Sequence, residues 1–295
     1  MAHRGWDEAH SPRRQRRAAL NETGYVEGQN LIVEYHWLEG QYNRLPSLMD
    51  ELVRRRVAVI ATPGSNPASL AAKTATATVP IVFGVGEDPV KLGLVASLAR
   101  PGSNATGINF FGHEVVTKRL GLLHELAPKA VRIAVLVNPA NAPSAEAVLR
   151  AMPDAARATG LKTQFLKAST SEEVEAAFAT LLRDPADALF VAGDGFFVSR
   201  RVQFATLTAR HAIPAIYSVR EYVEGGGLMS YGADDLERFR QAGIYTGQIL
   251  KGAKPADLPV MQSTKFEFVI NLVTARALGF EVPNSIQLLA DQVIE

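Results

Sequence analysis

The sequence predicts an α/β fold made of two doubly wound parallel-sheet lobes. From residue 31 onward, short β-branched or aliphatic runs alternate with longer amphipathic stretches, a pattern typical of βαβ units and parallel sheets. Most of the runs are almost entirely apolar, as in "VAVIAT" (57–62) and "RIAVLVN" (132–138), which indicates helices on both faces of a sheet. The segment "VAVIATPGSNPASLAA" is echoed by "IAVLVNPANAPSAEAV" (133–148), so we expect two lobes with the same strand–loop–helix order.

The individual elements follow from where each pattern starts and stops. Apolar runs bounded by Gly, Pro and polar residues predict strands over 31–37, 57–62, 79–85, 105–110, 132–138, 162–168, 187–193, 214–219, 227–232 and 266–272. Amphipathic periodicity predicts a first helix ending at Gly24, a last helix at the C-terminus, and helices over 43–56, 66–78, 113–128, 144–160, 171–183, 199–211 and 235–250. We expect the first lobe to contain 13–112 and about 236–265, and the second 113–235 and about 266–295, with residues 1–12 irregular.

The composition excludes several classes of protein. Lys and Arg total 31 against 30 Asp and Glu, for a net charge of +1, whereas nucleic-acid-binding proteins usually carry a clear basic excess. The chain has no cysteine, which excludes disulfides, thiolate zinc sites and cysteine nucleophiles. No apolar run reaches the roughly 18–20 residues that a membrane-spanning helix needs.

The loops that follow the predicted strands lack the common catalytic motifs. The sequence contains no phosphate-binding G-x-x-x-x-G-K-[ST], no G-x-S-x-G nucleophile elbow and no H-E-x-x-H zinc motif. The short clusters "GVGED" and "GDGFF" do not make the G-x-G-x-x-G of a dinucleotide site. We therefore expect no cofactor, no metal ion and no enzymatic activity.

The same loops carry small polar residues that run directly into predicted helices. A helix N-terminus presents unpaired N–H groups and a partial positive charge, so it can hold a carboxylate; alternatively, these Ser and Asn residues only cap the helices. Asp88 and Asp194 stand at strand ends and are candidates to pair with a ligand ammonium, although Asp88 before Pro89 could equally cap a helix. Phe196 and Phe197 are adjacent, so in an extended segment one of the two rings would face away from the core.

In open α/β sheets, ligands bind beyond the carboxyl ends of the strands. The residues predicted to bind a ligand there are Thr62, Ser65, Asn66, Gly86, Asp88, Asn138, Asn141, Asp194, Phe196, Tyr217, Glu221 and Ser230. Helix N-termini that can bind a carboxylate, Asp side chains that can bind an ammonium group and nearby aromatic side chains are together more typical of a binding site for an amino-acid-like molecule than of an active site.

Several phrases of the sequence resemble a known family. "VPIVFGVGEDPVKLGLVASLARPGSNATG", "KRLGLLHELAPKA", "GGGLMSYG" and "ILKGAKPADLPVMQSTKFEFVINLVTARALG" are similar to the substrate-binding proteins of ABC transporters, including tryptophan-binding types. The resemblance covers about residues 14 to 295 and implies a type I periplasmic-binding-protein fold with a ligand cleft between two lobes. It also implies a non-catalytic monomer that closes about a hinge on an aromatic or other amino acid and delivers it to a membrane permease. By this resemblance the location is periplasmic or membrane-anchored.

The N-terminus departs from the family pattern. Family members begin with a signal or lipoprotein peptide, followed by a strand and a Ser/Gly loop, whereas "MAHRGWDEAHSP" (1–12) has one large apolar residue and no β-branched residue. As written, the chain carries no signal peptide and would remain cytoplasmic. We expect an N-terminally truncated first lobe, with a gap or a repaired pairing between the strands at 31–37 and 57–62 and with reduced stability.

Two other functions stay open on the sequence alone. A cytosolic small-molecule sensor of the same fold would also lack a signal peptide. An α/β enzyme would use Asp88, Asp194 or His113, although the sequence offers no nucleophile–base pair or metal cluster to support it.

Overall fold

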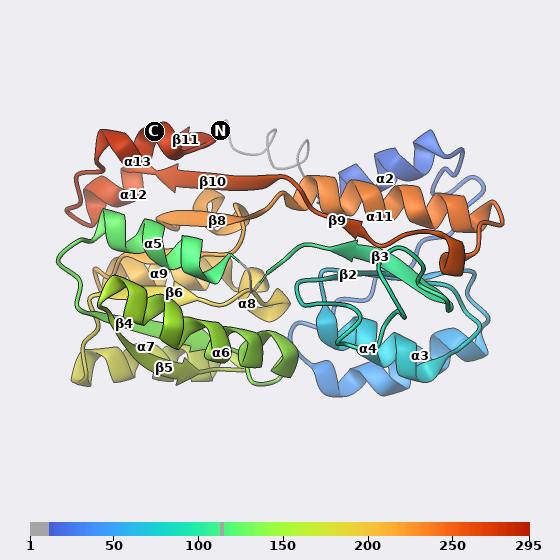
Figure 1. Cartoon of the computed structure of the whole chain (residues 1–295), viewed down its shortest axis with the longest axis horizontal. Coiled ribbons are helices and arrows are strands. Elements are labelled where there is room, and N and C mark those ends of the chain that lie inside the picture. Colours follow the sequence, from blue (N-terminus) through green and yellow to red (C-terminus); the bar gives the residue numbers. More distant parts are fainter. Residues whose placement is uncertain (1–11, 113–114) are drawn as a thin grey trace. The chain divides into compact units, whose positions relative to one another are not determined.

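The computed structural model describes residues 12–112 and 115–295 (Figure 1). The chain divides into two compact units, each made of two separate stretches of sequence. Unit 1 comprises the residues up to Phe111 together with Asp234–Thr264, and unit 2 comprises Gly112–Ala233 together with Lys265–Glu295. Each unit is therefore completed by a late segment, as the orange helix α11 (Asp235–Leu250) beside the blue helix α2 (Pro12–Glu22) shows for unit 1 (Figure 1).

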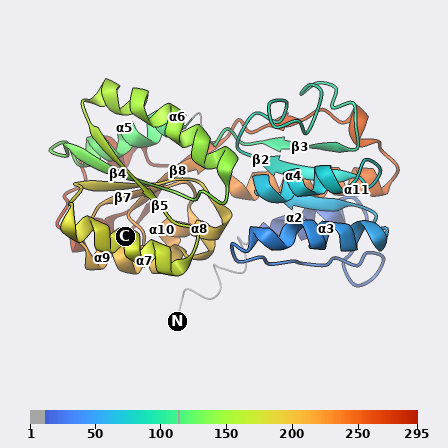
Figure 2. The same cartoon turned by 90° about the horizontal axis from the view of Figure 1, so that it is seen from below.

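Unit 1 is built around a parallel sheet with the strand order β1-β2-β3-β9. Besides α2 and α11, its elements are η1 (Tyr42–Arg44), α3 (Leu45–Arg54), β1 (Ile60–Pro63), α4 (Asn66–Ala75), β2 (Ile81–Val85), β3 (Ala105–Asn109), η2 (Pro255–Asp257) and β9 (Met261–Gln262). Alternate residues of β2 face two hydrophobic clusters. Phe83 packs with residues of α3 and α4, whereas Val82 packs with Ala242 of α11 on the other face. Figure 2 shows α3 and α4 together beside the strands, and the predicted helices on both faces are confirmed.

The predicted strand over 31–37 is wrong. Leu31 forms an isolated bridge with Glu27, and the residues after it pair with no strand in the described part of the chain. Ile32 and Trp37 are 88% and 66% exposed, so these two side chains meet no core, whereas Leu31, Val33 and Tyr35 are partly exposed. The pattern is compatible with a strand, but a strand also needs a neighbour to satisfy its backbone N–H and C=O groups.

Strand β1 accordingly forms an edge of the sheet within the described residues, since it pairs only with β2. Ile60 donates its N–H to Pro80 and Gly64 to Gly84, so alternate residues point their N–H groups away from β2. Pro63 occupies one of these outward positions and has no N–H, as is typical of edge strands. Residues 1–11, which the sequence suggested to be irregular, lie outside the described residues, and Pro12 already belongs to α2.

Unit 2 is built around a larger sheet with the order β11-β10-β8-β7-β6-β4-β5. Its elements are α5 (Val116–Leu126), β4 (Arg132–Val137), α6 (Ala142–Thr159), β5 (Lys162–Lys167), α7 (Ser171–Arg183), β6 (Ala188–Val191), α8 (Gly195–Ser199), α9 (Arg201–Arg210), β7 (Ala215–Tyr217), α10 (Glu221–Glu224), β8 (Met229–Ala233), β10 (Phe266–Asn271), α12 (Leu272–Ala277), α13 (Asn284–Leu289) and β11 (Gln292–Ile294). Neighbouring strands are parallel except β8 and β10, which are antiparallel. Strand β11 lies in the segment where the sequence predicted only a helix.

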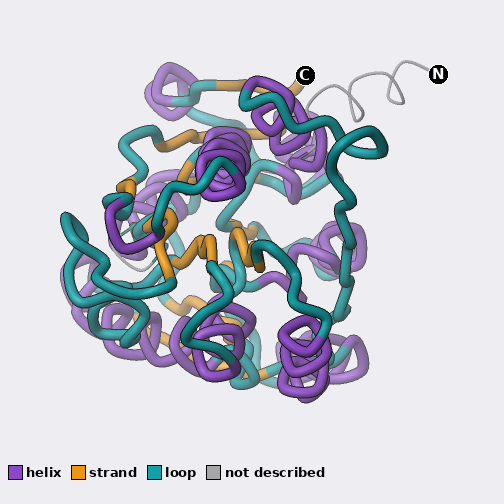
Figure 3. The backbone as a smooth tube through the Cα atoms, turned by 90° about the vertical axis from the view of Figure 1, so that its right-hand side faces the viewer, coloured by secondary structure: helices purple, strands orange, loops and turns teal. Residues whose placement is uncertain are grey.

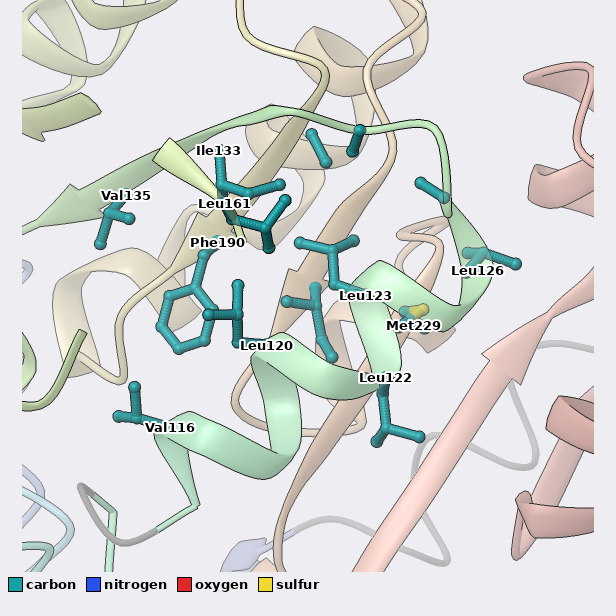
Figure 4. Close-up of a cluster of buried hydrophobic side chains, with 14 of the residues drawn as sticks. Val116, Leu120, Leu122, Leu123, Leu126, Ile133, Val135, Leu161, Phe190 and Met229 are labelled. Atoms are coloured by element: carbon teal, nitrogen blue, oxygen red, sulfur yellow. The ribbon is translucent and has the colours of Figure 1, made fainter. Parts of the chain in front are cut away.

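The strands of unit 2 are buried on both faces. In β4, Ile133 and Val135 belong to a cluster with α5 and α6, and Ala134 and Leu136 belong to a second cluster with α7 and α9. Figure 4 shows Leu120 of α5 pointing toward Phe190 in the first cluster. Figure 3 colours the backbone by secondary structure, with helices in purple and strands in orange. Such double burial explains why these strands are almost continuously apolar in the sequence.

Candidate functional site

The loop after β1 leads directly into α4. Ser65 is the N-cap of α4, and its Oγ accepts a hydrogen bond from the Ala68 N–H at 3.3 Å. Thr62 is 7% exposed, and its Oγ1 lies 2.9 Å from Ser69 Oγ. Gly64 has φ = 116°, a conformation that favours glycine. The capping interpretation of Ser65 is thus confirmed, and Thr62 stabilises the loop from inside.

Asn66 ties the loops after β1 and β2 together. Its Oδ1 accepts from the Gly86 N–H at 3.4 Å, and its Nδ2 donates to the Glu87 carboxylate. Asn66 and Glu87 are 5% and 8% exposed. The structure therefore brings Asn66 and Gly86 together, and the buried acid beside them is Glu87, which the sequence analysis did not single out.

Asp88 follows Glu87, and in the described structure its side chain accepts hydrogen bonds only from backbone N–H groups close to it in the sequence. Its Oδ1 accepts from the N–H groups of Val90 at 2.9 Å and Lys91 at 3.4 Å. Its side chain is partly exposed. Asp88 therefore stabilises a turn, whereas the alternative that it caps a helix is wrong, because no helix lies between β2 and β3 in the described structure.

Asp194 organises the carboxyl ends of β4 and β6 in unit 2. It is 6% exposed and caps α8 by accepting from the Phe197 N–H at 3.1 Å. Its two oxygens also accept from Asn138 Nδ2 at 2.9 Å and from Asn141 Nδ2 at 3.0 Å. The amide oxygen of Asn141 is buried with no hydrogen-bond partner in the described structure. The three predicted residues form one network, which leaves a buried acceptor available to a further donor.

The loops around this network are held by further hydrogen bonds. Asn138 Oδ1 accepts from Ser169 Oγ at 2.9 Å and from the Ala140 N–H at 3.0 Å. Ser144 Oγ donates to the Gly193 carbonyl at 2.8 Å. These contacts fix Asn138 and the residue before Asp194, so the carboxylate is held in a set orientation.

Arg119 of α5 is a buried cation that the sequence analysis missed. It is 1% exposed, and its Nε is buried with no hydrogen-bond partner in the described structure. Its Nη2 donates to the carbonyls of Val191 and Ile216, and its Cζ lies 4.1 Å from the centroid of the Phe190 ring. Burial lowers the pKa of Arg119 to about 9, so it stays protonated near neutral pH. Arg119 therefore joins the ends of β6 and β7, the strands that lead to Asp194 and Glu221.

A signal for Arg119 exists in the sequence. It lies three residues after Val116 and one before Leu120, on the face that the buried residues of α5 define. A charged residue on the apolar face of an amphipathic helix is a candidate for a buried functional group. Arg238 of α11 has the same signature, because it shares a face with the buried residues Asp235, Ala242 and Tyr245.

The aromatic candidates are core residues in this structure. Phe196 and Phe197 are 3% and 0% exposed and belong to the same cluster. The prediction that one ring faces away from the core is wrong, because the segment is the short helix α8 and not an extended strand. Tyr217 is fully buried and stacks on Tyr222 with ring centroids 4.3 Å apart, and this burial raises its pKa.

The last two predicted residues lie on regular elements. Ser230 is 1% exposed inside β8, opposite Tyr217 on one side and Val269 on the other, so it belongs to the sheet and not to a loop. Glu221 is the first residue of α10, which follows β7. That any of the predicted residues contacts a ligand remains a prediction.

A surface pocket of about 470 Å³ lies elsewhere on unit 2, lined by Glu175, Ala176, Ala179, Leu182, Arg210 and His211. These residues belong to α7 and the end of α9 and include none of the predicted site residues. The described residues also contain no group of three or more His, Cys, Asp or Glu side chains placed to hold a metal ion. Among the described helices, none combines the length and apolarity needed to cross a membrane.

The chain belongs to the ABC transporter substrate binding protein family, whose model matches residues 11–294. It is 30% identical over 263 residues to the tyrosine-binding protein of Clostridioides difficile (strain R20291), a match that covers 89% of this chain and 75% of that protein. The family suggested by the sequence is therefore confirmed.

Solved structures agree with this assignment. A conserved domain protein from Vibrio cholerae matches with a TM-score of 0.86 and 27% identity, covering 96% of this chain and 94% of that one. An ABC domain from Streptococcus pneumoniae, solved in complex with L-Trp, matches with a TM-score of 0.85, 26% identity and the same coverage. A glucose-galactose binding protein from Geobacillus stearothermophilus, at 14% identity, and a periplasmic solute binding protein from Actinobacillus succinogenes, at 17% identity, show the fold alone. The predicted type I periplasmic-binding-protein fold is thus confirmed.

Proposed function

We propose that this protein is the solute-binding component of an ABC importer and binds an aromatic amino acid without transforming it. The observation that carries the proposal is the buried Asp194 carboxylate, oriented by Asn138 and Asn141 at the carboxyl ends of β4 and β6. A carboxylate held by amide donors suits an ammonium ligand. The loops that follow the strands carry none of the common catalytic motifs, so binding without turnover is the simpler function.

The relatives support the class of ligand. One is named a tyrosine-binding protein, and another was solved with L-Trp. In the proposal, Asp194 and the free oxygen of Asn141 receive the ligand ammonium, and the start of α4 receives its carboxylate. Loops of both units would contact the same ligand by hinge closure. A membrane permease would then accept the ligand from a periplasmic or membrane-anchored binding protein.

Calorimetric titration of the purified chain with amino acids tests this proposal. We expect L-Tyr or L-Trp to bind, while glucose, which has neither an ammonium nor a carboxylate group, does not. Asp194→Asn removes the charge but keeps the shape, so affinity should fall about 10- to 100-fold, the range of a charge-assisted hydrogen bond.

Asp154→Asn is the matched control for this substitution. Asp154 lies on the exposed face of α6, with its side chain 78% accessible and paired only locally with Arg157, so binding should be unchanged. Failure of the wild-type chain to bind any amino acid would refute the proposed function. Equal affinity of Asp194→Asn and wild type would refute the role of Asp194.

A further inference from the structure

Unit 1 contains a buried guanidinium next to the loop that leads into α4. Arg238 lies in the second turn of α11 and is 7% exposed. A side chain added at Gly64 would place its Cβ 3.2 Å from Arg238 Nη2 and 3.4 Å from Cζ. The guanidinium therefore lies against Gly64, the residue before the N-cap of α4. Only glycine leaves this face of the loop open to it.

Arg238 is held in this position from two sides. Its Nη2 donates to Asp235 Oδ2 at 2.7 Å. Its Cζ lies 4.4 Å from the centroid of the Phe110 ring, which follows β3, an arrangement typical of a cation–π contact. The carboxyl ends of β1 and β3 thus approach one guanidinium.

The ion pair between Arg238 and Asp235 is incomplete. Arg238 Nε and Asp235 Oδ1 are both buried and have no hydrogen-bond partner in the described structure. Burial raises the pKa of Asp235 even though the neighbouring Arg238 acts in the opposite direction. Two buried charges that share one hydrogen bond recover little of their desolvation cost, so the site is poised to accept a further group.

The backbone beside Arg238 also offers hydrogen-bond donors. The N–H of Asn66, the first residue of α4, has no acceptor within the helix, and Pro67 has no N–H. In the described structure neither Ser65 nor Asn66 donates its backbone N–H to another residue. A guanidinium and open N–H groups at a helix N-terminus are all donors, and the group that satisfies them is an oxyanion.

We propose that Arg238 is a ligand-binding residue of unit 1, and that its guanidinium and the start of α4 together bind the carboxylate of the amino acid. This inference rests on the proposed function and adds the residue that selects for a carboxylate. Arg238 is a planar donor already oriented by Phe110 and Asp235, so little side-chain freedom is lost on binding. Ligands with the same ring and ammonium but without the carboxylate should bind much more weakly.

The test compares L-tyrosine with L-tyrosinamide, and L-tryptophan with its amide, by calorimetry at about pH 6, where an α-ammonium remains protonated. Wild type should prefer the acids. Arg238→Met keeps the length of the side chain but removes its charge, and should weaken binding of the acids about 10- to 100-fold while changing the amides less than threefold. Arg240→Met on the same helix is the matched control, because Arg240 is partly exposed and paired with Glu22.

A second variant covers the possibility that Arg238→Met fails to fold, which circular dichroism would reveal. Asp235→Asn removes the competing carboxylate, so the acids should bind about two- to tenfold more tightly and the amides should not change. Equal effects of Arg238→Met on acids and amides, or no effect on either, would overturn the inference while leaving the proposed function intact. Wild-type chain that binds no amino acid would overturn the proposed function, and this inference with it.

Discussion

At the scale of single residues, Tyr222 buries a hydroxyl that donates to no acceptor in the described structure. Its ring is fully buried and stacks on Tyr217. A buried polar group without a partner loses its hydration and gains nothing in return, at a cost of about 1–3 kcal/mol. Removing such a hydroxyl while keeping the ring should therefore not harm the fold.

We expect Tyr222→Phe to leave the free energy of unfolding unchanged or to raise it by about 1 kcal/mol at neutral pH, measured by urea unfolding. Tyr245→Phe is the matched control, because the Tyr245 hydroxyl donates to the Pro259 carbonyl at 2.6 Å. Loss of this bond should lower the free energy of unfolding by about 0.5–1.5 kcal/mol. A Tyr222→Phe variant that is as destabilised as Tyr245→Phe would show that the Tyr222 hydroxyl has a partner.

Tyr222→Phe should also change how the free energy of unfolding depends on alkaline pH. Burial, assisted by the nearby Asp194, raises the pKa of Tyr222 well above its ordinary value. The unfolded chain releases this proton near pH 10, whereas the folded chain retains it. The contribution of this proton to the free energy of unfolding is therefore fully present below pH 10 and is lost as pH rises further. The loss is about 1.4 kcal/mol per pH unit for one such group. The alkaline decline in stability should be shallower by that amount in Tyr222→Phe than in wild type.

At the scale of elements, α2 packs against α11 through glycines of α11. A Cβ on Gly247 would lie 2.0 Å from Thr23 Oγ1, and one on Gly243 would lie 2.7 Å from the Arg16 carbonyl. Such distances cannot be accommodated without moving the helices apart. The two glycines, four residues apart on one face, are therefore required for this contact.

We expect Gly247→Ala to lower the free energy of unfolding by about 1–3 kcal/mol, because the added methyl group overpacks the contact. Gly121→Ala in α5 is the matched control, since a Cβ there meets nothing within 4 Å. That variant should be stabilised by about 0.5–1 kcal/mol through the higher helix propensity of alanine. Chemical denaturation measures both, and a shift of the same sign in the two variants would contradict the close packing.

Elements were predictable from the sequence where periodicity extends over several turns or a whole strand. Helix α7 (Ser171–Arg183) matches the predicted 171–183, because its pattern and its Thr170 cap are local. The elements α8, α10, β9 and β11 were missed since each has only two to five residues. The segment 31–37 was assigned wrongly because pairing depends on a distant partner, which no local pattern reveals.

The candidate site was predictable to a similar extent. Asp194, Asn138 and Asn141 could be placed together because strand ends of a parallel sheet meet at one edge, and β4 and β6 are neighbours. Arg119 and Arg238 were missed because charged residues on amphipathic helices usually face solvent. Their spacing from apolar residues was the signal in the sequence, and the tertiary structure shows that this face of each helix is buried.

At the scale of the whole molecule, the two units have separate hydrophobic cores and sheets of unequal extent. Strand β4 in unit 2 is paired on both sides, and its residues other than Arg132 are buried. Strand β1 in unit 1 pairs only with β2 within the described residues, and half of its residues are partly exposed. Local opening should therefore cost less at β1 than at β4.

Hydrogen exchange followed by mass spectrometry measures this difference in the unliganded chain. Peptides covering β1 (Ile60–Pro63) should exchange at least about 30-fold faster than peptides covering β4 (Arg132–Val137), since an opening free energy lower by about 2 kcal/mol gives a factor of that size. Strand β2 serves as the internal control, because it is fully buried and paired on both sides in unit 1. It should exchange more slowly than β1. Slow exchange at β2 together with fast exchange at β1 would show that the low free energy of opening belongs to the edge strand and not to the whole of unit 1. Equal protection of β1 and β4 would show that an additional contact covers this edge, and would contradict the expectation of a less stable first lobe.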